Sequence, residues 1–280
     1  MNQGHYIGQV ASLATRHAKD EAIAPVFGDV LGLDVIVTDI DTDAFGTFAG
    51  EILRTDTPVN TAIAKARAGM TASGHSIGLA SEGTIGPDPL LPFVTSDIET
   101  IVFIDDTRQI VLSETWRSGD IVTFREIVSS DTDLSKLAQR ADFPRHGLIV
   151  RPSSHSDGPI IKGITTTDAL LAAVEQCFSA DGGAVVESDF RACYSPSRMR
   201  NIGDCAQQLA LRINTSCPDC AGPGWGRIQP IRGLPCSDCG TLVESAVRAD
   251  VFGCPACPAV QEVPRSDQTA EPRWCPFCNP

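Results

Sequence analysis

The stretch GQVASLATRHAKDEAIAPVFGDVLGLDVIV, residues 8–37, begins an alternation of apolar segments that continues along most of the chain. Residues 6–14 have the short apolar run of a buried strand. From Asp20 to Leu31 apolar residues recur at helical spacing, and Asp34–Ile40 is a second apolar run. Strands that alternate with helices are typical of an α/β domain.

The same alternation extends to about residue 212. Later apolar segments predict further strands at residues 77–81, 98–105, 109–116, 120–128, 147–152 and 183–190. Helices are expected at residues 58–72, 131–143, 165–179 and 196–213. We therefore expect an α/β domain over residues 1–212, with flanking helices on a mixed sheet, and a separate module over residues 213–280.

Composition and charge narrow the classes of partner. The 280 residues carry a formal net charge of -13, which argues against broad binding to nucleic acid or an anionic membrane. A small anion could still bind in a local basic pocket. No run reaches the roughly 20 apolar residues that span a membrane, and the start lacks the features of a signal peptide. We expect a soluble, cytoplasmic protein whose oligomeric state the sequence does not fix.

The last 64 residues hold eight of the eleven cysteines, arranged as four CxxC pairs. Such a segment has too few large apolar residues to fold without a metal. CxxC pairs suit tetrahedral zinc with four thiolate ligands, so we predict two structural zinc ions in a double zinc ribbon. The predicted ligands are Cys217, Cys220, Cys236, Cys239, Cys254, Cys257, Cys275 and Cys278.

The pairing of these cysteines is less determined. Fifteen residues separate the first two pairs and seventeen the last two, which favours sequential pairing over a cross-braced arrangement. Disulfides are disfavoured in a reducing cytosol, whereas an iron–sulfur or redox role stays open. The module could bind a protein partner.

A basic junction follows the first predicted strand. Thr15, His17 and Lys19 lie where free N–H groups at a helix start attract anions. The alternative is a capped, solvated turn.

An acidic, glycine-containing loop follows the second predicted strand. Asp43 and Glu51 are its best candidates for holding magnesium, which binds through a few carboxylates, waters and substrate phosphates. Glu51 could instead orient a water molecule. The alternative is a solvated acidic loop.

Further candidates come later in the chain. Glu82 follows a small-residue segment that we place at the end of a strand, where α/β sheets bind ligands, and it could hold magnesium together with Glu51. Lys65 could meet a phosphate or pair with the acidic loop. Arg191 and Arg198 could contact an anion or form surface ion pairs, and no spacing supports Cys193 with His155 as a nucleophile and base.

The order of these segments resembles the inosine/xanthosine triphosphatase-like (ITPase/Maf superfamily) pyrophosphatases. The resemblance covers residues 6–118 and rests on ATRHAK, GTFAGEILRTD, NTAIAKARAG, GLASEGTIG and ETIVFIDDTRQIVLSETW. The whole chain, with its CPFCNP ending, resembles an uncharacterised bacterial family of this layout. The inosine/xanthosine triphosphatase-like pyrophosphatases are α/β proteins that hydrolyse aberrant purine nucleoside triphosphates with magnesium.

The resemblance implies a role for each matching residue. Thr15 and Lys19 would contact phosphate, Glu51 would serve the metal with Lys65 nearby, and Glu82 would lie at the floor of the site. The chain has His17 where the family has asparagine, and its Lys19 lies one residue earlier than the family's lysine.

Together these features predict magnesium-dependent hydrolysis of a nucleoside triphosphate or related phosphate ester, in a protein with structural zinc. The catalytic candidates are Lys19, Glu51 and Glu82. The alternative is a non-catalytic zinc-ribbon protein that binds a nucleotide or a protein partner.

Overall fold

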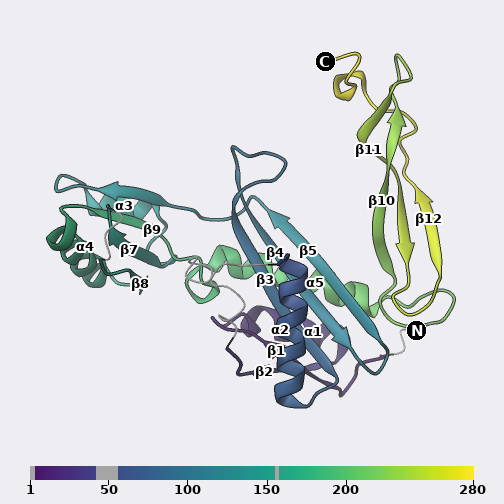
Figure 1. Cartoon of the computed structure of the whole chain (residues 1–280), viewed down its shortest axis with the longest axis horizontal. Coiled ribbons are helices and arrows are strands. Elements are labelled where there is room, and N and C mark those ends of the chain that lie inside the picture. The colour runs from purple at the N-terminus through teal and green to yellow at the C-terminus, as the bar shows by residue number, and fades with distance from the viewer. Residues whose placement is uncertain (1–3, 42–55, 155–157) are drawn as a thin grey trace.

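The computed structural model describes residues 4–41, 56–154 and 158–280, which form an elongated molecule (Figure 1). A central α/β part carries a smaller α/β lobe on one side and a long three-stranded arm on the other. We call these the central part, the lobe and the arm. The described residues contain three sheets and five α-helices, which confirms a mixed α/β fold.

The central part is built on a five-stranded sheet in the order β2-β1-β3-β4-β5. Its strands are β1 (Val10–Ala14), β2 (Asp34–Thr38), β3 (Ile77–Pro87), β4 (Thr95–Asp105) and β5 (Ile110–Ser118). The strand β1 pairs in parallel with β2 and β3, whereas β3–β4 and β4–β5 are antiparallel. The sheet is therefore mixed.

Helices cover both faces of this sheet. The helices α1 (Asp20–Leu31) and α5 (Pro196–Asn214) pack on one face, in a core that includes Leu13 and Phe103. The helix α2 (Pro58–Ser73) packs on the other face, against small side chains such as Ala80. Each face of the sheet thus has its own hydrophobic core.

The lobe has a separate sheet and a separate core. Its strand order is β6-β9-β7-β8, and apolar side chains of these strands pack with its two helices. The elements are β6 (Arg125–Val128), α3 (Leu134–Arg140), β7 (Leu148–Pro152), β8 (Ile161–Ile164), α4 (Thr167–Asp181) and β9 (Ala184–Ser188). The 3-10 turn Ala192–Tyr194 then leads into α5.

The arm is an antiparallel sheet in the order β10-β11-β12. Its strands are β10 (Gly226–Pro235), β11 (Leu242–Gly253) and β12 (Val260–Pro264), and a 3-10 turn covers Pro272–Trp274. These strands are mostly exposed, so their sequence lacks the apolar periodicity by which a strand is recognised. The four cysteine pairs lie at the two ends of this sheet, two pairs at each end.

The structure extends one of the strands expected from the sequence. The strand expected at residues 77–81 continues to Pro87, so Glu82 lies inside β3 and not at the end of a strand. The domain boundary after residue 212 falls within the last turn of α5, and it stays a prediction, as does the ITPase-like fold. None of the helices in the described ranges is both long and apolar enough to cross a membrane.

Candidate functional site

The eight cysteines of the arm form two groups of four. In each group, the four Sγ atoms all lie within 4.8 Å of one another. The base tetrad, beside the central part, comprises Cys217, Cys220, Cys254 and Cys257. The tip tetrad, at the far end of the arm, comprises Cys236, Cys239, Cys275 and Cys278.

The spacing of the sulfur atoms fits tetrahedral zinc. In the base tetrad, sulfur atoms of different CxxC pairs lie 3.7 and 3.6 Å apart, and in the tip tetrad 3.9 and 3.6 Å apart. Four sulfurs about 2.3 Å from one zinc ion require separations of about 3.8 Å, whereas a disulfide requires about 2.05 Å. The tetrads are thus compatible with two zinc ions. Four thiolates fill the coordination sphere, which is the pattern of structural zinc.

The predicted sequential pairing is wrong, because the first CxxC pair joins the third and the second joins the fourth. The reason is the length of the strands. Ten-residue β10 separates the first pair from the second, and a strand of that length spans about 33 Å. In an antiparallel meander, every second connection between strands lies at the same end of the sheet. The first and third pairs therefore meet at the base of the arm, and the second and fourth pairs meet at its tip.

Local backbone geometry shapes the CxxC turns. Ala221 and Gly240, which directly follow the second cysteine of their pairs, both have positive φ angles of 58° and 75°. Their N–H groups donate to the carbonyls of Cys217 and Cys236, each at 3.0 Å. These closed turns hold the two sulfurs of each pair on the same side.

The thiols of the tip tetrad lie close enough to influence one another's pKa values. Hydrogen bonds from the side chain and then the backbone of Thr241 lower the pKa of Cys239 to about 6. The sulfur of Cys239 in turn raises the pKa of Cys278. A bound cation stabilises neighbouring thiolates, so the tetrad suits a metal ion.

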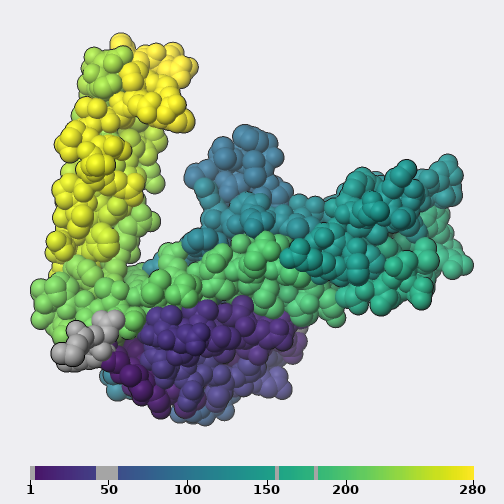
Figure 2. Space-filling view, turned by 180° about the vertical axis from the view of Figure 1, so that it is seen from behind, coloured from purple at the N-terminus to yellow at the C-terminus, as the bar shows by residue number. Residues whose placement is uncertain are grey.

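The base tetrad is joined closely to the central part. The N–H groups of Gly224 and Trp225 both donate to the carbonyl of Thr215, each at 3.0 Å. A Cβ at Gly224 would lie 2.7 Å from Leu112 of β5 and 2.9 Å from Pro255, which lies between Cys254 and Cys257. The tip tetrad lies at the opposite end of the arm, away from both α/β parts (Figure 2).

The second candidate site lies at the carboxyl edge of β1. The chain leaves β1 toward the face covered by α1, whereas α2, which follows β2, lies on the opposite face. Divergent connections of this kind mark the place where open α/β sheets bind ligands. Beyond Ala14, the partner of Ala80, β3 continues along this edge through Ser81 and Glu82.

The basic junction forms a tight turn at this edge. His17 and Ala18 both adopt the left-handed conformation, with φ angles of 66° and 58°. The N-cap of α1 is Lys19 and not Thr15, and the hydroxyl of Thr15 donates to the carbonyl of Arg16 at 3.2 Å. The first turn of α1 carries Asp20 and Glu21, which already complement its dipole.

Lys19 reaches back across the edge of the sheet. Its Nζ donates to Oγ of Ser81 at 3.1 Å. Burial, and then the charge of Arg198, lowers the pKa of Lys19 to about 8. Glu99 and Glu82 act in the opposite direction, and Lys65 adds to the lowering, so these charges from four segments lie within electrostatic reach of Lys19.

Two buried ion pairs flank Lys19 on opposite faces of the sheet. On the α2 face, Lys65 pairs with Glu82. On the α5 face, Nε of Arg198 donates to Oε1 of Glu99 at 2.6 Å. All four side chains are at most 9% exposed. The structure thus brings Lys65, Glu82 and Arg198 near Lys19, although the sheet separates the two pairs. Their roles at a ligand site stay predictions.

A second carboxyl adjoins Glu99 on the α5 face. Asp97, two residues earlier in β4, accepts from Nδ2 of Asn201 at 2.9 Å. Burial, and then the charge of Glu99, raises the pKa of Asp97 to about 7. Asp97 is fully buried, so at neutral pH its carboxyl carries a proton for part of the time. Sequence reasoning missed Asp97 and Glu99 because each looks like an ordinary strand position.

The other predicted residues lie elsewhere or outside the described ranges. Arg191 forms a two-pronged pair with Asp189, at 3.0 and 2.6 Å, and its guanidinium lies 4.5 Å from the centre of the Tyr194 ring. Asp43 and Glu51 fall in residues 42–55, outside the described ranges. The same holds for His155, the suggested base for Cys193.

A hydrogen-bonded Asp–His–Ser arrangement, which the sequence did not indicate, connects the lobe to α5. Nδ1 of His146 lies 2.8 Å from Oδ2 of Asp142, and its Nε2 lies 3.0 Å from Oγ of Ser197. Ser197 is fully buried, and its Oγ also accepts from the backbone N–H of Val122 at 3.1 Å. A nucleophile must be reachable by substrate, so this arrangement is structural: it fixes the start of α5.

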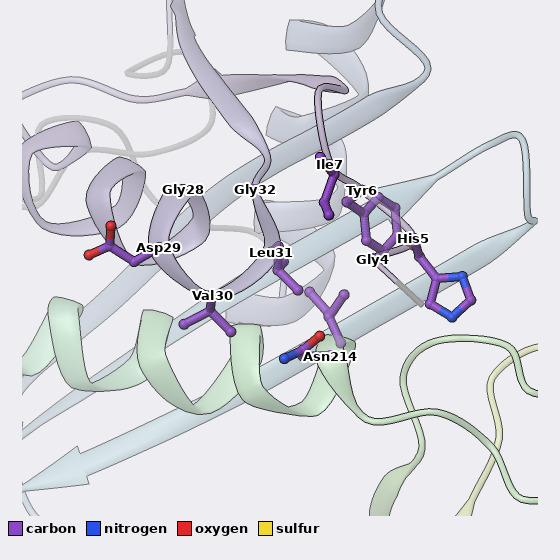
Figure 3. A pocket seen from close by; sticks show the side chains of 11 residues that line it. Gly4, His5, Tyr6, Ile7, Gly28, Asp29, Val30, Leu31, Gly32 and Asn214 are labelled. Atoms are coloured by element: carbon purple, nitrogen blue, oxygen red, sulfur yellow. The ribbon is translucent and has the colours of Figure 1, made fainter. Parts of the chain in front are cut away.

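A pocket of about 400 Å³ lies at the other end of the central part (Figure 3). It is lined by the turn at residues 4–7, the end of α1 at residues 28–32, and the end of α5 at residues 213–214. None of the predicted site residues lines it. Its walls combine polar side chains such as His5 and Asp29 with apolar ones such as Ile7 and Leu31.

Comparison with known proteins gives one family. The profile of a family described as "Domain of unknown function (DUF6671)" matches residues 65–280. The match includes all eight tetrad cysteines and the residues Lys65, Glu82 and Arg198. No curated protein matches the chain. The likeness to the inosine/xanthosine triphosphatase-like pyrophosphatases stays a prediction from the sequence.

Proposed function

The chain belongs to the DUF6671 family, and on that premise we propose that it binds a phosphorylated small molecule at the carboxyl edge of β1. The ligand class is a nucleotide, and the expected reaction is hydrolysis of a nucleoside triphosphate or related phosphate ester. Two structural zinc ions hold the arm. One observation carries the proposal: Lys19 lies against Ser81 at the edge where such sheets bind ligands, and its charge is influenced by the buried Lys65–Glu82 and Arg198–Glu99 pairs.

The lowered pKa of Lys19 supports an anion ligand. Its described side-chain partner is the neutral hydroxyl of Ser81, and the nearby cation Arg198 disfavours its charge. A phosphate beside Lys19 would offset both burial and repulsion, because an anion stabilises the charged form of lysine. Ligand binding at neutral pH would therefore raise the pKa of Lys19.

Magnesium finds no fitting site among the described residues. The carboxylate of Glu82 is paired with Lys65, and that of Glu99 is paired with Arg198. The predicted magnesium ligands Asp43 and Glu51 lie outside the described ranges. The test is therefore carried out both with and without magnesium.

The test measures binding and turnover together. Zinc-loaded protein is titrated calorimetrically with a panel of nucleoside triphosphates, and pyrophosphate release is followed with and without magnesium. We expect binding of at least one triphosphate, at least a 10-fold weaker Kd for Lys19→Gln, and pyrophosphate release by the wild-type protein. Lys136→Gln is the matched control, because Lys136 is 79% exposed on α3 of the lobe.

Each outcome separates the alternatives. Tight binding without pyrophosphate release would support the non-catalytic reading, in which the edge only recognises the ligand. Absence of binding for every triphosphate, or equal affinity for K19Q and K136Q, would overturn the proposal.

A further inference from the structure

The tip of the arm presents three large apolar side chains to solvent. Leu242 is 55% exposed, Trp274 is 63% exposed and Phe277 is 74% exposed. We call these three residues the tip surface. The tip projects away from both α/β parts (Figure 2), so within the molecule these side chains lie apart from the cores of the central part and the lobe.

The tip surface lies beside the tip tetrad in the chain. Trp274 directly precedes Cys275, and Phe277 lies between Cys275 and Cys278. Leu242 follows Cys239 by three residues, at the start of β11. Because the cysteine sulfurs converge within 4.8 Å, the three apolar residues are adjacent to one fixed point. Rigid aromatic side chains on a projecting surface are typical anchors of protein interfaces.

The charge around the tip is negative. Residues 235–245 and 270–280 contain the carboxylates Asp238, Glu244 and Glu271 and the guanidinium of Arg273, which together give -2. Four thiolates bound to one Zn²⁺ contribute a further -2. A zinc-loaded tip therefore carries about four negative charges close to its exposed aromatic rings.

One arginine of the tip, Arg273, already contacts both an aromatic ring and a carboxylate. The guanidinium of Arg273 lies 5.2 Å from the centre of the Trp274 ring. The same guanidinium pairs with Glu271, with an Nε–Oε2 distance of 2.7 Å. A cation is thus held between an aromatic face and a carboxylate, which is the combination that recognises arginine and lysine.

We propose that the tip surface binds a polypeptide segment of a partner protein that carries arginine or lysine next to apolar side chains. The apolar side chains would cover Trp274 and Phe277, and the cations would meet the negative charge of the tip. Nucleic acids and anionic membranes would be repelled by that charge. A second copy of this chain, with its net charge of -13, would also be repelled.

The test uses the zinc-loaded full-length protein and defined peptides. A fluorescein-labelled peptide of alternating arginine and leucine is the probe, and a peptide with glutamate in place of each arginine is the comparison. Fluorescence anisotropy at about 50 and 500 mM salt gives the Kd. We expect the basic peptide alone to bind, with at least 10-fold weaker affinity at high salt because charges at this surface are screened.

Variants locate the binding to the tip. Trp274→Ala and Phe277→Ala should each weaken the Kd at least 5-fold while zinc content stays at two per chain. The control is Phe93→Ala, because Phe93 is equally aromatic and 85% exposed but lies on the β3–β4 hairpin. Equal affinity of the acidic peptide, no binding of either peptide, or equal effects of W274A and F93A would overturn the proposal.

Discussion

Gly83 of β3 lies directly opposite Glu99 of β4, and a Cβ at Gly83 would overlap both the carboxylate of Glu99 and the guanidinium of Arg198. The missing side chain therefore leaves the space that the buried Arg198–Glu99 pair occupies. Because the pair is fully desolvated, its partners cannot move apart without leaving an unpaired buried charge. The position needs glycine for space, since its backbone has no positive φ angle.

We predict that Gly83→Ala destabilises the protein by about 1–3 kcal/mol, the usual cost of overpacking a tight interior. It should also weaken ligand binding at the carboxyl edge of β1, since Arg198 would be displaced. Urea unfolding and calorimetric titration measure the two effects. Gly86→Ala is the matched control. Gly86 lies on the same strand, and a Cβ there would meet no atom within 4 Å. Equal stability of G83A and G86A would contradict the prediction.

Pairs of cysteine substitutions distinguish the interleaved arrangement from the sequential one. In the structure, Cys217 and Cys257 belong to one tetrad, whereas Cys217 and Cys239 belong to two. We expect C217S/C257S to keep one zinc per chain and C217S/C239S to keep none. Sequential pairing would give the reverse, because Cys217 and Cys239 would then share an ion. Metal analysis of the purified variants measures the zinc content directly.

The sequence predicted the central elements well where their patterns are regular. The helix at Asp20–Leu31 has the expected bounds, and the helix from Pro58 ends one residue later than expected. Prediction failed at β3, because the Gly- and Pro-containing segment 82–87 looks like a turn. That segment is a strand because β4 supplies an antiparallel partner at every position, which is a tertiary effect that no local pattern records.

In the candidate sites, too, the sequence indicated individual residues but not the distant partners that the fold brings to them. Residue type and spacing identified all eight cysteines of the two tetrads, but spacing alone could not reveal which pairs meet at one end of a meander. Lys65, Glu82 and Arg198 became candidates because charged residues next to apolar segments stand out, and their roles stay predictions. Asp97, Glu99 and His146 were missed because their role depends on partners more than 50 residues away, such as Ser197 and Asn201.

Asp97 should make stability fall as pH rises. Burial, and then Glu99, raises its pKa to about 7 in the folded protein, whereas an unfolded aspartate has a pKa of about 3.9. Between these values the folded state binds more protons than the unfolded state, so the free energy of unfolding decreases with pH. The penalty is complete above about pH 7.

We therefore predict that Asp97→Asn stabilises the protein at pH 8, by on the order of 1–3 kcal/mol. Near pH 5 its effect should be small, because Asp97 is then already neutral in the wild-type protein. Urea unfolding at both pH values provides the comparison, with Asp131→Asn on an exposed loop as the control. A variant that is equally destabilised at pH 5 and pH 8 would show that Asp97 does not act on stability through the titration of its carboxyl.

His146 should have the reverse pH dependence. Its Nε2 accepts the backbone N–H of Ser197 at 3.2 Å in the first turn of α5, so the ring must be neutral at that nitrogen. Burial lowers the pKa of His146 in the folded protein, against the opposing hydrogen bond to Asp142. The stability that His146 supplies is thus present above its unfolded pKa of about 6.5 and is lost as pH falls through its folded pKa.

The variant His146→Gln tests this role of His146 at the start of α5. At pH 8 we expect it to be about 1 kcal/mol less stable than the wild-type protein, the usual cost of losing a helix cap. At pH 5.5 the difference should shrink, because the unfolded imidazole takes up a proton below its pKa of about 6.5 while burial disfavours that proton in the folded wild-type protein. Urea unfolding at the two pH values, with zinc content checked in parallel, measures both differences. If the wild-type protein and H146Q lost stability equally between pH 8 and pH 5.5, His146 would not be the titrating group.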